Sequence, residues 1–82
     1  MLPPMHDGET LTEAKLAALA KYYRQASGKS QLDAARELRV SKPAIAMAEN
    51  NPEKSLSKLR KRLIERYSPF KVVGPAYWLE KK

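Results

Sequence analysis

The residues with the clearest chemistry form a basic cluster in the second half of the chain. Six cationic residues fall within thirteen positions, opposed only by Glu65: Lys54, Lys58, Arg60, Lys61, Arg62 and Arg66. Side chains of this kind at this density neutralise polyanions, most often nucleic acids. The whole chain has the same sign, with 16 Lys and Arg against 9 Asp and Glu, a net charge of +7 and a pI near 9.9. A pI above 9 favours a nucleic-acid partner over a surface that is basic for solubility alone.

The sequence contains few residues that could take part in catalysis or bind a metal ion. His6 is the only histidine, the chain has no cysteine, and Gly8, Gly28 and Gly74 are too far apart to form a phosphate-binding loop. No pair of clustered carboxylates suggests acid–base catalysis. We therefore expect no enzyme activity, no metal site and no cofactor. We interpret His6 as a solvent-exposed bystander.

Length and composition indicate one small globular domain. Of the 82 residues, 43% are hydrophobic and 30% are charged, and no apolar run is long enough to cross a membrane. The first residues lack the basic and apolar regions of a secretory signal. Residues 1–9, which contain Pro3, Pro4 and Gly8, are interpreted as a loose leader. The absence of cysteine is compatible with the cytoplasm, and we expect a cytoplasmic protein associated with the nucleoid.

A capping signal opens the first predicted helix. Thr10 and Glu13 have the spacing of a capping box, which predicts a helix from about residue 11 to 27. Gly28 is expected to end this helix in the left-handed conformation. Its apolar face contains Leu16, Leu19, Ala20 and Tyr23.

Two shorter helices follow. Ser30 and Asp33 repeat the capping signal and predict a second helix over about 31–38. Ser41 is a good N-cap for a third helix over about 42–50, which a proline follows closely. The connection between these two helices is only about three residues long.

A fourth helix and a segment of different character complete the pattern. Ser55 is expected to cap a helix over about 56–67, whose inward face contains Leu56, Leu59, Leu63 and Ile64. Residues 68–82 are rich in aromatic and β-branched side chains, which favours a strand or an extended pair over a disordered end. The predicted fold is therefore all-α, a four-helix domain over 10–67 with an extended or β-like C-terminal tail.

The two short helices and their tight turn have the helix-turn-helix arrangement. Over about residues 15–67 the chain resembles the phage repressor and Cro (XRE-type) family, at Ser30-Gln31, Ala35, Val40-Ser41, Ile45 and Glu49-Asn50. Arg39 stands where the family usually has a turn glycine, which implies a left-handed residue strained by about 1 kcal/mol. Lys29 replaces an apolar residue, and Asn51 replaces a small residue, often glycine, whose conformation it tolerates.

The resemblance implies double-stranded DNA as the partner and suggests which residues contact its backbone. Gln31 is expected to hydrogen-bond a phosphate at the N-terminus of the second helix, with a simple capping role as the alternative. Ser41 is expected mainly to cap the third helix, and its hydroxyl or amide to meet a phosphate. The other expected phosphate contacts are Lys54, Ser55, Lys58 and Arg62. Arg24 and Glu49 match a structural ion pair of the family.

The third helix occupies the position of a recognition helix but contains few hydrogen-bonding side chains. The positions expected to face the major groove are Lys42, Pro43, Ala44, Ala46, Met47 and Asn50. Lys42 can donate to guanine, and Asn50 to a base or phosphate, whereas the others offer only apolar contact, for instance to a thymine methyl. Direct recognition would then be modest, and DNA shape and phosphate contacts would carry more of the selectivity.

The C-terminal segment lies outside the resemblance and has two interpretations. In the first, it forms a dimer interface, because repressors of this type bind two half-sites as symmetric dimers. In the second, it covers the protein's own core. The candidate interface residues are Phe70, Val72, Tyr77, Trp78 and Leu79. The sequence thus predicts a dimeric, sequence-specific transcriptional regulator, a repressor. The alternatives are an antitoxin or adaptor that binds a protein such as a toxin, and a sequence-neutral DNA-packaging protein.

Overall fold

The computed structural model describes residues 12–73 and 78–82, with Trp78 described by its backbone alone. In these ranges the chain forms α1 (Glu13–Ala26), α2 (Gln31–Leu38), α3 (Lys42–Asn50), α4 (Ser57–Tyr67), β1 (Phe70–Val73) and β2 (Trp78–Lys81). Residues 1–9, Thr10 and Tyr77 lie outside the described part. The predicted fold class is confirmed, and the tail is a β-hairpin.

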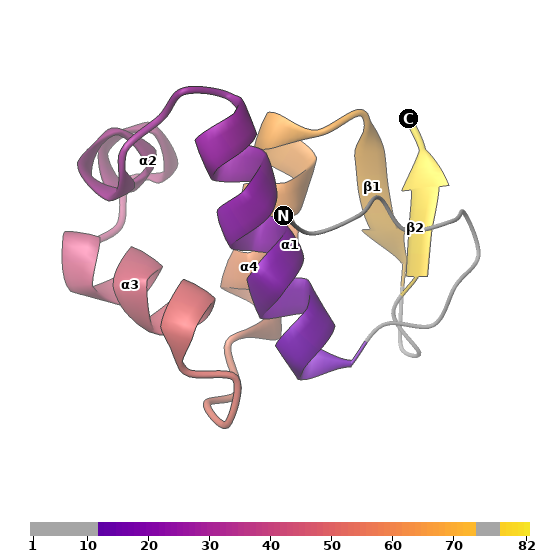
Figure 1. Ribbon diagram of the computed structural model, residues 1–82, viewed down its shortest axis with the longest axis horizontal. Helices are drawn as coiled ribbons and strands as arrows, with labels where there is room; N and C mark the ends of the chain where they lie inside the picture. The colour runs from indigo at the N-terminus through magenta and orange to yellow at the C-terminus, as the bar shows by residue number, and fades with distance from the viewer. Residues whose placement is uncertain (1–11, 74–77) are drawn as a thin grey trace.

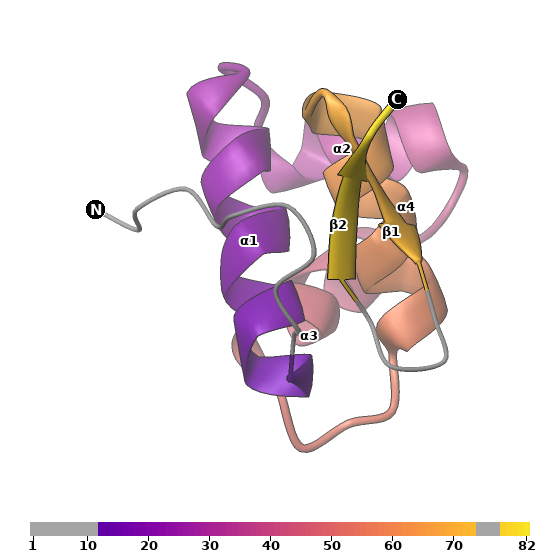
Figure 2. The same cartoon turned by 90° about the vertical axis from the view of Figure 1, so that its right-hand side faces the viewer.

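The elements form three groups along the long axis of the molecule. Figure 1 shows α1 and α4 side by side in the middle, α2 and α3 at one end and the hairpin at the other. The view turned by 90° in Figure 2 places the hairpin in front of α1 and α4, with α2 and α3 behind. Among the described residues, no helix is both long and apolar enough to cross a membrane.

Helix α1 begins two residues later than predicted. Thr12, not Thr10, is its N-cap, and the Thr12 hydroxyl oxygen accepts a hydrogen bond from the backbone N–H of Lys15 at 3.2 Å. Both threonines suit a cap locally, but the observed start places Glu13 in the first turn, where its carboxylate meets Arg60 from α4. The other end agrees with the prediction, because Gly28 has a φ of 72°.

The α2–α3 unit forms as the sequence predicts. Ser30 and Asp33 make both hydrogen bonds of the capping box, each 3.0 Å long. Arg39 ends α2 in the left-handed conformation, with φ 58° and ψ 47°, so the strain expected at this non-glycine residue is present. The Ser41 hydroxyl oxygen then accepts from the backbone N–H of Ala44 at 3.2 Å and starts α3.

The connection from α3 to α4 differs from the prediction at two residues. Asn51 has a φ of −122°, so it does not adopt the left-handed conformation of the glycine it replaces. Its side-chain amide instead donates to Glu53 Oε1 at 2.9 Å. Helix α4 has Leu56 as its N-cap residue and no side-chain cap, so the predicted cap at Ser55 is wrong. Leu56 packs against the core, as predicted for the inward face, but as the N-cap residue it lies just outside the helix.

One hydrophobic core connects all four helices and the hairpin. It contains Leu16, Leu19, Ala20, Tyr23, Ala34, Ala35, Leu38, Ile45, Ala48, Leu63, Ile64, Val72 and Leu79. Four of these core residues are alanines, whose small side chains allow helix backbones to approach closely. Each fully buried leucine or isoleucine contributes about 1.5–3 kcal/mol relative to an exposed one.

The hairpin covers this core with one face. β1 and β2 are antiparallel, and Val72 pairs with Leu79, so both side chains point inward and are buried. Phe70 is half-buried, with its ring centroid 6.3 Å from that of Tyr23. Val72 and Leu79 are therefore unavailable for the dimer interface predicted for them, because a side chain inside its own core cannot also contact a second copy.

Candidate nucleic-acid interface

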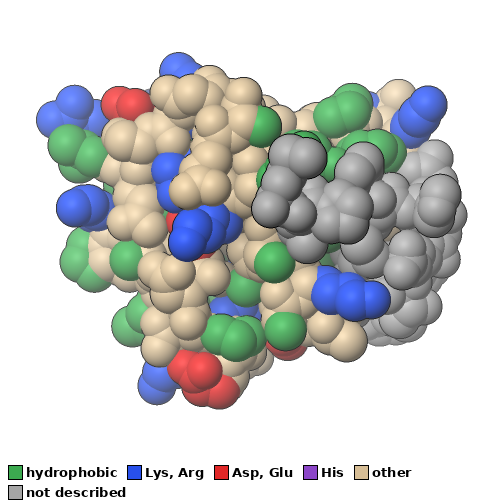
Figure 3. Space-filling model, in the orientation of Figure 1, with side chains coloured by type: hydrophobic (Ala, Val, Ile, Leu, Met, Phe, Trp, Pro, Cys, Tyr) green, Lys and Arg blue, Asp and Glu red, His purple; other side chains and the backbone are tan. Residues whose placement is uncertain are grey.

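The outer face of α3 is the centre of the candidate interface. Lys42, Pro43, Met47 and Asn50 are exposed, and Ala44 and Ala46 are partly exposed. Ile45, Ala48 and Glu49 are buried on the opposite side. All six residues predicted to face a major groove thus lie on the accessible side of the helix. Figure 3 shows hydrophobic side chains lying between lysine and arginine side chains along the edge formed by α2 and α3.

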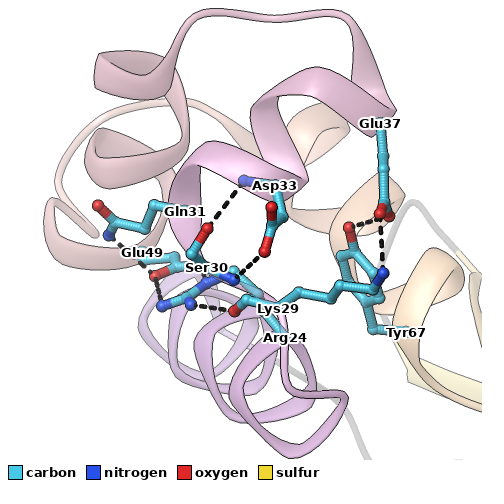
Figure 4. A network of polar contacts seen from close by, with 8 residues as sticks. All are labelled: Arg24, Lys29, Ser30, Gln31, Asp33, Glu37, Glu49 and Tyr67. Atoms are coloured by element: carbon cyan, nitrogen blue, oxygen red, sulfur yellow. Dashed lines mark hydrogen bonds and ion pairs between the residues drawn. The ribbon is translucent and has the colours of Figure 1, made fainter.

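A buried ion pair holds α3 against α1. Arg24 Nε donates to Glu49 Oε2 at 2.6 Å and Arg24 Nη2 donates to Glu49 Oε1 at 2.9 Å, a bidentate geometry (Figure 4). The side chains of Arg24 and Glu49 are 8% and 0% exposed. Arg24 Nη1 also donates to the backbone oxygen of Lys29 at 2.7 Å, which ties the chain just before α2 to the same guanidinium. This is the pair that the resemblance implied, and it fixes the orientation of α3.

Gln31 lies at the first position of α2, next to the ion pair. Its Nε2 donates to Glu49 Oε1 at 3.3 Å (Figure 4). This bond uses one of the two amide N–H groups and orients the rest of the amide. The capping box lies beside it, and the backbone N–H of Ser30 lowers the pKa of Asp33 from its usual value. Asp33 therefore keeps its charge, and with it the capping box, to a lower pH than an ordinary aspartate would.

The residues expected to bind phosphates after α3 divide into two groups. Lys54, Ser55 and Lys58 are exposed around the N-terminus of α4, which no side chain caps. Arg62 lies further along α4, and its Nη2 donates to the backbone oxygen of Leu38 at 2.6 Å. The structure therefore places Arg62 at the C-terminal end of α2, with part of its guanidinium already engaged.

Arg60 has a role that the sequence did not suggest. Although it belongs to the basic cluster, Arg60 is 0% exposed and is the largest fully buried side chain of the described residues. Its guanidinium donates to the backbone oxygens of Ala48, Asn51 and Lys54 at 2.7–2.8 Å, and to Glu13 Oε1 at 2.5 Å. Arg60 is thus not a phosphate contact. Its position four residues after Leu56 and four before Ile64 placed it on the inward face, and this spacing was the available signal.

A second polar cluster joins α2 to the end of α4. Tyr67 donates its hydroxyl to Glu37 Oε1 at 2.6 Å, and Lys29 Nζ lies 3.1 Å from Glu37 Oε2 (Figure 4). Arg66 also pairs with Glu37, at 3.4 Å. The Tyr67 hydrogen bond is the main cause that lowers the pKa of Glu37, and burial, followed by this bond, raises the pKa of Tyr67 to about 12. In the described residues, no three potential metal ligands of the His, Cys, Asp or Glu type come together.

Comparison with known proteins agrees with this geometry. A helix-turn-helix family model matches residues 21–62, which extend from the second half of α1 into α4 and include both short helices. No curated protein and no solved structure gives a significant match to the chain. The match covers half of the chain and includes the buried ion pair, the tight turn and the exposed face of α3. The chain therefore belongs to the XRE-type helix-turn-helix family, whose domain binds DNA.

Proposed function

We propose that the protein is a sequence-specific transcriptional regulator, a repressor, that inserts α3 into the major groove of double-stranded DNA. This proposal rests on one observation about helix α3. Its inner face is fixed by the buried Arg24–Glu49 pair, and its outer face is exposed. A recognition helix needs this combination, because its side chains must reach base edges from a rigid support. The net charge of +7 adds a general attraction to DNA.

The backbone contacts follow from the chemistry around α3. We assign them to Gln31, Ser41, Lys54, Ser55, Lys58 and Arg62. Gln31 and Ser41 lie at the N-terminal ends of α2 and α3, where the helix dipole and backbone N–H groups favour a phosphate. Lys54 and Lys58 flank the uncapped start of α4, which favours a phosphate for the same reason. These contacts position α3 without reading sequence.

Repression and dimerisation complete the proposal. A protein that occupies a promoter blocks transcription without any further activity, so DNA binding alone is sufficient for repression. One α3 contacts only a few base pairs, so two copies on an inverted repeat provide the affinity and selectivity that a regulator needs. Such a protein acts on the nucleoid of the cytoplasm.

The test is selection of binding sites from a randomised duplex library at physiological salt, followed by titration of the enriched duplex at several salt concentrations. Lys54→Ala and Lys58→Ala should each reduce the slope of log K against log salt by about 0.9. Lys71→Ala is the matched control, since Lys71 is an exposed lysine on the hairpin at the other end of the molecule. Salt-sensitive binding without an enriched sequence would leave only a sequence-neutral DNA-packaging role. No duplex binding would refute DNA binding altogether.

A protein partner is the second candidate function. Leu32 and Met47 are 43% and 42% exposed and are the exposed large hydrophobic side chains of the described residues. Exposed apolar side chains of this size favour contact with another molecule, and an antitoxin or adaptor would use them to bind a protein such as a toxin. Loss of DNA binding together with stable capture of a defined protein partner at these residues would favour this function.

A further inference from the structure

We infer that α3 recognises thymine methyl groups, so that the DNA sequences bound by this protein have T·A pairs opposite Met47 and Pro43. This inference rests on the proposed function and specifies its substrate. It concerns which base pairs are chosen, whereas the proposal above concerns binding to DNA itself.

The accessible side chains of α3 limit the ways in which it can recognise a base. Lys42 at the start and Asn50 at the end are its exposed hydrogen-bonding side chains. Between them, the exposed side chains are Pro43 and Met47, which cannot donate or accept a strong hydrogen bond. Glu49 also belongs to this helix, but it is buried, and both of its carboxylate oxygens accept hydrogen bonds from within the protein, from Arg24 and Gln31. The central part of α3 therefore meets the DNA with apolar atoms.

The major groove presents one apolar group that such atoms can recognise. The 5-methyl group of thymine projects into the groove, whereas guanine, adenine and cytosine present hydrogen-bond donors and acceptors there. A polar base edge placed against Met47 would lose water without gaining a partner, which is unfavourable. A thymine methyl in the same place loses water favourably. The same side chain thus selects for thymine and against the other bases.

The charges around this apolar centre specify DNA as its occupant. The exposed Lys42, Lys54 and Lys58 come from α3, from the loop after it and from α4. The exposed apolar side chains of Pro43 and Met47, together with these lysines, are complementary to the major groove, whose rims are phosphates and whose floor contains thymine methyl groups. Figure 3 shows this mixture of hydrophobic and basic side chains on the α2–α3 edge.

The test removes single methyl groups from the DNA. In the duplex enriched from the random library, each thymine is replaced in turn by uracil, which keeps all hydrogen bonds, and the dissociation constant is measured by fluorescence anisotropy at constant salt. One or more positions in each half-site should lose about fourfold in affinity, the value for removing one buried methyl-sized group. At the same position a C·G pair should bind more weakly than T·A, and 5-methylcytosine should restore about fourfold over cytosine.

Variants identify the side chain responsible. Met47→Ala should abolish the difference between thymine and uracil at the sensitive position, and the exposed position of Met47 means that the fold is retained. Leu32→Ala is the matched control, because it truncates an equally exposed apolar side chain on α2, outside the recognition helix, and should leave the difference unchanged.

The outcomes separate the inference from the proposal on which it rests. Selective, salt-sensitive binding with no position sensitive to uracil overturns methyl recognition and leaves the regulator intact. Binding without any enriched sequence also overturns methyl recognition, because no base is then selected. A chain that binds no duplex, or that uses Met47 to bind a protein, contradicts both.

Discussion

Arg60 Nη1 lies 2.5 Å from Glu13 Oε1, so a buried side chain of α4 is joined to the first turn of α1 across 47 positions of sequence. The same guanidinium donates to three backbone oxygens around the end of α3 and the loop that follows it. One side chain therefore fixes the loop that contains Lys54, a proposed phosphate contact. Among residues 51–56 no side chain is fully buried, and Leu56 is the one that packs against the core.

Replacing Arg60 should strongly destabilise the domain. Arg60→Leu leaves three backbone oxygens without their donor, and we expect the free energy of unfolding to fall by about 3 kcal/mol or more. Glu13→Gln should cost less than about 1 kcal/mol, because the Glu13 side chain is 37% exposed and its ion pair is screened by water. Urea unfolding of both variants measures the difference. Equal losses would mean that the ion pair, not the backbone contacts, is the important interaction.

Breaking the ion pair beneath α3 should be equally costly. Glu49→Ala leaves the Arg24 guanidinium buried without its carboxylate, which we expect to reduce the free energy of unfolding by about 3–5 kcal/mol. Glu53→Ala serves as the control, since it removes an exposed carboxylate a few residues away. The double variant Arg24→Met/Glu49→Ala should be less destabilised than the sum of Arg24→Met and Glu49→Ala measured singly. Additive losses in this urea-unfolding cycle would show that Arg24 and Glu49 are not coupled.

Replacing Arg39, the left-handed residue in the turn, should increase the stability of the domain. Because Arg39 has a φ of 58°, Arg39→Gly should raise the free energy of unfolding by about 1 kcal/mol. Arg39→Ala is the control, since alanine removes the same charge but keeps the Cβ that causes the strain. Thermal unfolding of the two variants at equal salt compares them. If alanine stabilised as much as glycine, the effect would come from the charge and not from the backbone.

The cluster at Glu37 should make stability depend on pH in a defined direction. A carboxyl whose pKa is lower in the folded than in the unfolded state stabilises the fold above its unfolded pKa of 4.5, and this contribution is lost as the pH falls through the folded pKa. Tyr67→Phe removes the hydrogen bond that is the main cause of the lower pKa of Glu37, so it should destabilise the domain at neutral pH and less once the pH has fallen below the folded pKa of Glu37. Urea unfolding across this pH range measures the effect. A loss that is independent of pH would assign the cost to packing of the ring.

At alkaline pH, the stability of the domain should depend on the ionisation of Tyr67 itself. The raised pKa of Tyr67, about 12 against 10.0, means that its contribution is complete below pH 10 and lost as the pH rises towards 12. Tyr67→Phe should therefore also flatten this alkaline limb. Tyr22→Phe is the comparison variant, because it removes a phenol hydroxyl outside the Glu37 cluster, where the Tyr22 ring contacts Tyr23 instead.

Much of the helix-turn-helix unit could be predicted because its signals are local. The capping residues Ser30 and Ser41, the left-handed Gly28 and the strained Arg39 each depend on a few neighbouring residues, and all adopt the predicted state. The alternation of buried and exposed positions on α3 follows from helical periodicity alone. These features need no knowledge of the rest of the chain.

The errors concern interactions between distant parts of the chain. Thr10 has the capping-box spacing with Glu13, yet Thr12 is the N-cap, and this start places Glu13 beside Arg60, which is distant in sequence. Arg60 is counted in the basic cluster by sequence alone, because its backbone acceptors come together only when α3, the loop and α4 are folded. Val72 and Leu79 are hydrophobic enough for an interface or a core, and the choice depends on whether the hairpin reaches its own helices.

The position of the hairpin sets a limit on the spacing of the bound DNA half-sites. The hairpin and α3 lie at opposite ends of the long axis, which measures 30 Å, so two copies joined hairpin to hairpin in line would hold their α3 helices at most roughly 60 Å apart, twice that length. Half-sites on adjacent turns of one DNA face are only about 34 Å apart, and those separated by two turns about 68 Å. A selected inverted repeat with the shorter spacing would thus require a dimer interface closer to α3. The longer spacing would exceed what even this in-line dimer can reach, so the half-sites would then be occupied without a hairpin-to-hairpin contact.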